Sequence, residues 1–471
     1  MTQIMSRLRV WGAPAIWGLS SDRLHTPPWH LCLLFAAGFS VLVCYPAWPG
    51  LMSFDSLFAY KESITGIETQ IWPPMHAYLL FVSRTLTGGP GGLFVLQTFL
   101  LALGGAGIIG TLTGSRPAVA LGLVFFGAAF WGFPTLLGTT IAIWKDVPVV
   151  SFALMAMFCW LTALRRGSVW IYAGALFFIF LATATRWNAV TLYGPWLGLV
   201  ILFPWNLTPR LGQRGISLVC ILATLGLATA TGAWRLPDFK KLPPIANAMA
   251  PNQRWDMIGT SLCAGKVLIP AQVIDGPLPT LGQLRTIYSP KHLNETLLDE
   301  RGPVWLQSTL MTDKMTQDAW LDLMRNHTGC FLSHRLFVEQ EQYGLVKGHV
   351  FYAAHSGIDS NPYGLKNAHP DLTLAVTSWI NQTSDQGVRR AWVLTLGGLM
   401  AACWLMISGR HRGLVLALVL GEIASALALA LLAPAADARY AFPTNVISAL
   451  LLGLALAQVI DSRFRYRAAQ A

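Results

Sequence analysis

Long apolar runs recur along the whole chain, and they restrict its fold more than any other feature. Clear examples are Trp29–Pro46, Gly91–Leu112, Pro117–Leu137 and Phe442–Ile460. A helix needs about 20 mainly apolar residues to cross the roughly 30 Å of hydrocarbon in a bilayer. Charged residues make up only 12% of the chain, whereas soluble domains average about 25%. The sequence therefore predicts an all-α, polytopic integral membrane protein.

Clusters of basic residues between these runs set the predicted topology, because basic loops usually face the cytoplasm. The clusters are Arg7/Arg9/Arg23, Arg116, Arg165/Arg166, Arg210/Arg214, Arg410/Arg412 and Arg463/Arg465/Arg467. Placing all of them inside gives about ten transmembrane helices (10–12), with both termini in the cytoplasm. The predicted spans are 29–46, 91–113, 117–139, 147–164, 168–185, 188–204, 215–233, 388–408, 413–433 and 442–460.

Two polar segments fall on the outer side in this topology. They are the first loop, 47–72, and the segment 234–387, which we expect to form a small, mostly helical periplasmic domain. Cys263 and Cys330 lie in that domain, where an oxidising compartment would allow them to pair. The other divisions are a cytoplasmic N-terminus (1–28), a transmembrane catalytic module (29–233), C-terminal transmembrane helices (388–460) and a cytoplasmic tail (461–471).

The stretch Pro73–Leu86 is apolar but too short to span comfortably, and it contains Arg84. We therefore expect an interfacial or re-entrant helix there. Trp72 and the pair Pro73-Pro74 predict an extended segment that leads into this helix and shapes a pocket, because proline is tolerated in a first turn. His76 then faces either that pocket or the protein interior.

Charge and cysteine spacing argue against a nucleic-acid-binding protein and against a metal site built from cysteines. The net charge is +11, but the basic residues form short clusters rather than the continuous stripe that is typical of nucleic-acid binding. The seven cysteines show no CxxC or Cys/His ligand spacing, so they predict no metal site.

Asp55 lies just beyond the first span, among apolar and aromatic neighbours near the outer face. Such surroundings are expected to raise the pKa of its carboxylic acid. A carboxylate that titrates nearer neutrality is suited to take a proton from an acceptor hydroxyl. An aspartate in front of Ser-Leu-Phe is also a common helix N-cap, so a structural role stays open.

Lys145 and Asp146 stand together at the outer start of another span. A charged residue costs about 2.5–3.5 kcal/mol at the centre of a membrane helix, so these two are expected to pair or to line a wet cavity. Asp146 is either a cap for the helix or a second cavity carboxylate that faces Asp55.

Arg186 and Arg439 lie at the outer boundary of the membrane, against the general trend for basic residues. Guanidinium groups bind phosphate with two parallel hydrogen bonds, so both are candidates for holding a lipid phosphate, together with Lys145 or Arg84. The structural alternative is that their side chains extend to the lipid headgroups.

These motifs together resemble one known arrangement, that of the C-type (GT-C fold) membrane glycosyltransferases. The resemblance rests on an Asp in the first outer loop, a Pro-Pro before a short helix, Lys-Asp-Val-Pro and Arg-x-Asn-Ala at spans, a large late outer domain and Arg-Tyr-x-x-Pro at the last span. The superfamily includes protein O-mannosyltransferases and lipid A aminoarabinose transferases. The layout is similar over most of the chain, whereas the matching motifs are short.

The resemblance implies an enzyme of the inner (plasma) membrane that takes a sugar from a polyprenyl-phosphate donor on the periplasmic face. The acceptor would be a hydroxyl of a glycan, a lipid or a protein. Asp55 matches the catalytic aspartate and Asp146 the second acidic position, and Arg186, Arg439, Lys145 and Arg84 would neutralise the leaving phosphate. Tyr440 shapes the pocket. Transfer would be a single displacement that inverts the anomeric centre.

The chain departs from the family pattern at two places. Trp72 stands where many members have histidine, and Ser56 follows Asp55 where some branches have a second acid. The resemblance therefore requires no cofactor and leaves a divalent metal open. Two other classes also stay open: a polysaccharide or O-antigen polymerase, and a transporter or flippase, for which Glu422 near the middle of a span is the supporting feature.

Overall fold

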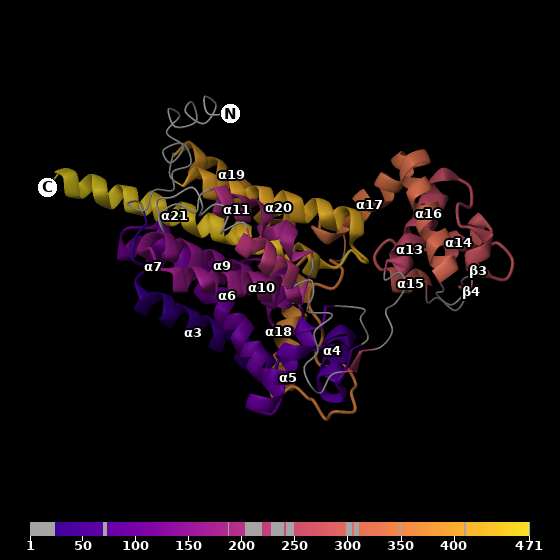
Figure 1. The fold of residues 1–471 in the computed structure, drawn as a ribbon, viewed down its shortest axis with the longest axis horizontal. Coiled ribbons are helices and arrows are strands. Elements are labelled where there is room, and N and C mark those ends of the chain that lie inside the picture. Colours follow the sequence, from indigo (N-terminus) through magenta and orange to yellow (C-terminus); the bar gives the residue numbers. More distant parts are fainter. Residues whose placement is uncertain are drawn as a thin grey trace.

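The structure of the protein is a computed structural model, shown in Figure 1. It describes residues 24–68, 73–186, 188–202, 219–227, 240–241, 249–297, 304–305, 310–346, 348, 350–408 and 411–470. Regular structure in these ranges is almost entirely helical, which confirms the predicted all-α fold class in outline.

The helices fall into a bundle that holds the long apolar helices and a more polar helical domain. Following the prediction from the sequence, we name them the membrane module and the extramembrane domain. The module contains α3 (Trp29–Ala47), α4 (Phe54–Thr65), α5 (Met75–Thr87), α6 (Gly91–Leu112), α7 (Arg116–Gly132), α8 (Pro134–Thr140), α9 (Asp146–Arg166), α10 (Val169–Thr185), α11 (Ala189–Leu202), α18 (Pro370–Thr383), η4 (Gly387–Arg389), α19 (Ala391–Ile407), α20 (Arg412–Leu432), η5 (Ala438–Ala441) and α21 (Phe442–Gln470). The domain contains α13 (Ala250–Ala264), η3 (Ala271–Val273), α14 (Leu281–Ile287), α15 (Leu293–Leu297), α16 (Leu310–Asn326) and α17 (Thr328–Gln342).

Short strands occur in two pairs within the described residues. β1 (Ile67–Glu68) runs parallel to β2 (Lys240–Lys241), with Ile67 opposite Lys240. β3 (Ile274–Asp275) runs antiparallel to β4 (Val304–Trp305), with Ile274 opposite Trp305.

Five helices of the described chain are long and apolar enough to cross a membrane: α3, α6, α9, α20 and the segment Ala438–Phe464. They support a multi-pass membrane protein. The helices α10 and α19 are equally apolar but have only 17 residues each. The predicted spans 188–204 and 215–233 lie partly outside the described residues, so about ten spans stays a prediction.

The predicted span 117–139 is wrong as one continuous helix. The chain breaks at Phe133, and α7 and α8 meet at 89°. Pro134 causes the break, because its nitrogen cannot donate to the preceding turn and its ring fits only the start of a new helix. The short α8 is buried, and any side chain at Gly138 would collide with the Ala353 carbonyl.

Small residues allow close packing inside the module. α6 packs against both α3 and α9, α21 against α7 and α19, and α11 against α20. Gly104 and Gly107 of α6 leave room for Leu154 and Phe158 of α9. Small residues at such contacts let helix backbones approach closely, which is how membrane helices gain van der Waals contact.

The extramembrane domain projects beyond one end of the helix bundle (Figure 1). A disulfide between Cys263 and Cys330 joins α13 to α17, as the sequence led us to expect. The structure divides the predicted domain 234–387, since α18 packs on α3 and α8 of the module. The segment before α18 also pairs with the first loop, where the Met52 amide donates to the Gly357 carbonyl at 3.0 Å.

Candidate active site

Elements from both ends of the chain surround a cavity that has acidic and basic side chains in its walls. Its walls come from α4, α5, the residues before α9, and η5; the lining residues are Asp55, Ser56, Ala59, Glu62, Pro73, His76, Ala77, Ile143, Trp144, Lys145 and Arg439. The space between these side chains, including the part open to solvent, is about 390 Å³. Five of the predicted site residues therefore meet here: Asp55, Pro73, His76, Lys145 and Arg439.

Asp55 lies in the first turn of α4, but Ser53 is the N-cap of that helix, so the capping interpretation is wrong. Its carboxylate instead forms an ion pair with Arg439, with Oδ2 at 3.0 Å from Nη1. Arg439 Nε lies 2.8 Å from Asp437 Oδ2, and the guanidinium carbon is 5.0 Å from the centre of the Trp144 ring. One guanidinium thus bridges two carboxylates on top of an aromatic ring.

The ion pair overturns the expectation of a raised pKa at Asp55. Burial alone favours the neutral acid, but the positive charges of Arg439 and then Lys145 outweigh it and lower the pKa. Asp437 differs, because burial is the dominant effect there and raises its pKa to about 6. Asp55 is therefore an ionised carboxylate held by a cation at neutral pH.

Lys145 and His76 complete the charge distribution of this cavity. Burial and the nearby Arg186 lower the pKa of Lys145 to about 7, although Asp55 and Glu62 oppose the shift. Burial and Lys145 lower the pKa of His76 to about 4, so its imidazole is neutral. His76 is only 5% exposed, and it lines the cavity rather than the helical core.

A second cavity lies next to the first, since Asp146 follows Lys145 and Tyr440 follows Arg439 in the two linings. Asp146 is fully buried and forms an ion pair with Arg186. Both line a space of about 310 Å³ together with Val149, Asn188, Ala189, Leu192, Ser425, Leu429, Tyr440 and Pro443. Asp146 therefore pairs with an arginine and faces this cavity, instead of capping α9 or facing Asp55.

Tyr440 contacts an arginine of each cavity. The guanidinium carbons of Arg186 and Arg439 each lie 5.3 Å from the centre of its ring. The second cavity holds one ion pair among aliphatic side chains of α9, α11 and α20, whereas the first is lined by two acidic and two basic side chains. Two arginines therefore stand between a cavity rich in charges and one with a single ion pair.

Two of the predicted site residues, Arg84 and Pro74, line neither cavity. Arg84 donates to the Ser63 carbonyl at 3.0 Å and lies over Phe81, so it braces α5 against α4 and lines neither cavity. Pro74 is the N-cap of α5, which confirms the predicted start of that helix. Trp72 lies outside the described residues.

Two site residues were missed from the sequence. Glu62 lines the first cavity seven residues after Asp55, a spacing that places both on one face of α4. Asp437 stands two residues before Arg439, and its side chain accepts a hydrogen bond from the Arg439 amide at 3.2 Å. Helical spacing could have found Glu62, whereas only the fold reveals the contact of Asp437.

Within the described residues, no group of three or more His, Cys, Asp or Glu side chains is arranged to hold a metal ion. No protein-family model, curated protein or solved structure matches this chain. The functional argument therefore depends on the arrangement of the charged residues around the two cavities.

Proposed function

We propose that the protein is a membrane glycosyltransferase that moves a sugar from a polyprenyl-phosphate donor to an acceptor hydroxyl on the outer face of the membrane. The observation that carries the proposal is the Arg439 bridge between Asp55 and Asp437 beside the two cavities. The aliphatic side chains of the second cavity suit a lipid chain, the arginines suit its phosphate, and the charged side chains of the first cavity suit a sugar and an acceptor.

The reaction follows from competition for Arg439. A donor phosphate that approaches the arginines offers them a second anion, so the guanidinium moves its hydrogen bonds from Asp55 toward the phosphate. Losing that cation makes the Asp55 carboxylate more basic. Donor binding thereby prepares the base.

In the transfer step, the acceptor oxygen attacks the anomeric carbon and forms the new glycosidic bond. The bond between that carbon and the phosphate oxygen breaks, and its electron pair leaves with the polyprenyl phosphate. The acceptor proton passes to Asp55. Arg439 and Arg186 stabilise the negative charge that grows on the leaving phosphate.

The disulfide between Cys263 and Cys330 supports the outer-face orientation, since structural disulfides persist in oxidising compartments. The domain that carries it and the Asp55 loop then lie on the same side of the membrane. This side is where a sugar on a flipped lipid carrier would be presented.

The test is transfer of radiolabelled sugar from polyprenyl-phosphate sugars in membranes that contain the wild-type chain or Asp55→Asn at equal expression. We expect the variant to lose most transfer. The matched control is Asp371→Asn, an exposed aspartate in the first turn of α18, which should transfer normally. Full transfer by Asp55→Asn would refute the assignment of Asp55.

The transporter alternative depends on Glu422 of α20. Its carboxylate is buried and accepts a hydrogen bond from Ser448 of α21 at 2.8 Å. That contact gives Glu422 a role in joining two helices. Absence of transfer from every lipid-linked donor tried, by a folded wild-type chain, would favour transport over glycosyl transfer.

A further inference from the structure

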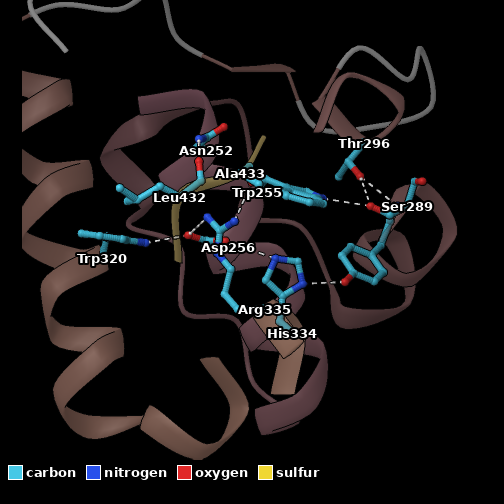
Figure 2. A network of polar contacts seen from close by, with 11 residues as sticks. Asn252, Trp255, Asp256, Ser289, Thr296, Trp320, His334, Arg335, Leu432 and Ala433 are labelled. Carbon is cyan, nitrogen blue, oxygen red and sulfur yellow. Dashed lines mark hydrogen bonds and ion pairs between the residues drawn. The ribbon is translucent and has the colours of Figure 1, made fainter. Parts of the chain in front are cut away.

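The extramembrane domain forms hydrogen bonds with the chain segment just before Arg439. The helix α20 ends at Leu432, and the last carbonyls of any helix lack partners within it. Asn252 Nδ2 donates to the Leu432 carbonyl at 2.9 Å, and Arg335 Nη1 donates to the Ala433 carbonyl at 2.7 Å. Figure 2 shows both side chains reaching these two residues from the domain.

A buried polar network holds Arg335 in place (Figure 2). Asp256 accepts hydrogen bonds from Arg335 Nη2 at 2.6 Å and from Trp320 Nε1 at 2.7 Å. His334 Nε2 lies 3.1 Å from the other carboxylate oxygen, and its Nδ1 lies 2.7 Å from the Tyr288 hydroxyl. Asp256 and Arg335 are almost fully buried, so every lost contact in this network is costly.

Backbone hydrogen bonds also hold the rest of the segment 433–438. The Ala436 amide donates to the Lys291 carbonyl at 2.6 Å, and the Ala438 amide donates to the Phe351 carbonyl at 3.1 Å. The Ala436 side chain packs against Trp255 and Val338 of the domain. The segment leads directly into η5, which carries Arg439.

We propose that Arg335 and Asn252 are positioning residues, which fix the segment 433–438 and through it the place of Arg439 beside Asp55. The inference rests on the proposed function for the role of Arg439, but the positioning itself does not. Neither residue lines the cavities described above. The domain is then part of the phosphate-binding machinery, in addition to any part it takes in recognising the acceptor.

Hydrogen–deuterium exchange of the full-length protein tests the positioning without any substrate. Arg335→Gln and Asn252→Ala should each speed exchange at the Ala436 and Ala438 amides by about tenfold, the value of one lost hydrogen bond to a charged or buried group. The control is Arg325→Gln, an exposed arginine of α16 that should leave exchange unchanged.

Folding is checked in the same samples through the disulfide and through slow exchange in α13. Asn252→Ala removes one neutral hydrogen bond and is the variant to use if Arg335→Gln fails to fold, because Arg335→Gln leaves Asp256 buried without its cation. Unchanged exchange at 433–438 in a folded variant would overturn the positioning.

Steady-state transfer then tests the link to the site. We expect Arg335→Gln to raise the KM for the polyprenyl-phosphate donor by about tenfold with a smaller change in kcat, and Arg335→Lys to restore part of the loss. A merely structural defect would lower the amount of active protein and leave KM unaltered, which would contradict the inference. No transfer even by the wild-type chain would refute the proposed function, while the exchange data would still decide the positioning.

Discussion

Arg439 contacts Asp55 across nearly the whole length of the chain, with 3.0 Å between Nη1 and Oδ2. The same guanidinium also contacts Asp437. It is therefore held by two anions in the structure, and a phosphate must compete with both of them. This competition shapes the first prediction.

Replacing Arg439 should separate its charge from its geometry. Arg439→Gln is expected to lower transfer by about 10²–10³-fold, because it removes a donor from the developing charge of the leaving phosphate. Arg439→Lys keeps the charge but not the fork that bridges Asp55 and Asp437, so it should retain only part of the activity. Arg285→Gln, an exposed arginine of α14, is the control. Full activity in Arg439→Lys would show that the bridge itself is dispensable.

Donor binding should weaken as the pH rises above about 7. Lys145, whose pKa is lowered to about 7, is protonated below that pH and loses its charge above it, so the donor phosphate loses one attraction. Asp437, with a pKa raised to about 6, is already ionised in that range. Asp55 stays ionised and His76 stays neutral.

The measurement is donor affinity against pH for the wild-type chain and Lys145→Arg. Arginine keeps its charge throughout, so the variant should bind the donor equally well on both sides of pH 7. Arg186 and Arg439 do not titrate in this range, and they provide a constant background. A wild-type affinity that is flat with pH would contradict the assignment of Lys145 as a phosphate ligand.

Glu62→Gln should move that pH dependence to lower values. The Glu62 carboxylate favours the protonated form of Lys145, so removing its charge lowers the pKa of Lys145 further. Donor affinity should then begin to fall at a lower pH than in the wild-type chain. The control is Asp371→Asn, at an exposed aspartate that lines neither cavity. An identical pH profile in Glu62→Gln would mean that Glu62 and Lys145 are not coupled.

Loss of the disulfide should destabilise the extramembrane domain. Cys263→Ser opens a loop whose ends are separated by 67 residues, and losing such a bond typically costs about 2–5 kcal/mol in a small domain. Thermal unfolding in detergent should show a lower midpoint for this variant. Cys403→Ser, at an exposed cysteine of α19, should unfold like the wild-type chain.

The sequence was sufficient to predict a helical, multi-pass membrane protein and five of the residues that line the first cavity, because these features leave local signals. Apolar runs mark α3, α6, α9, α20 and α21, and charges near their ends mark Asp55, Lys145 and Arg439. The start of α5 followed from Pro73-Pro74. Each of these signals depends only on residues that are close together in the sequence.

The pairings could not be predicted, because they depend on contacts between distant segments. Asp55 has apolar neighbours in sequence, which favoured a raised pKa, while the cation that lowers it comes from η5. For Asp146 the sequence left two roles open, a helix cap and a carboxylate that faces Asp55, but in the fold Asp146 pairs with Arg186. Pro134 was a local signal for the break. The residues on both sides of it are apolar, however, so the sequence pattern indicated one continuous span.

Tyr440 contacts both Arg186 and Arg439, so neither cation can be displaced without changing the surroundings of the other. Arg439 lines the first cavity, and Arg186 lines the second. A ligand that moves one of these cations should therefore change the affinity of the other cavity for its own ligand. Such coupling is reciprocal: binding in the first cavity changes the affinity of the second by the same factor as binding in the second changes the affinity of the first. Donor and acceptor would then report on each other's presence before any bond is made.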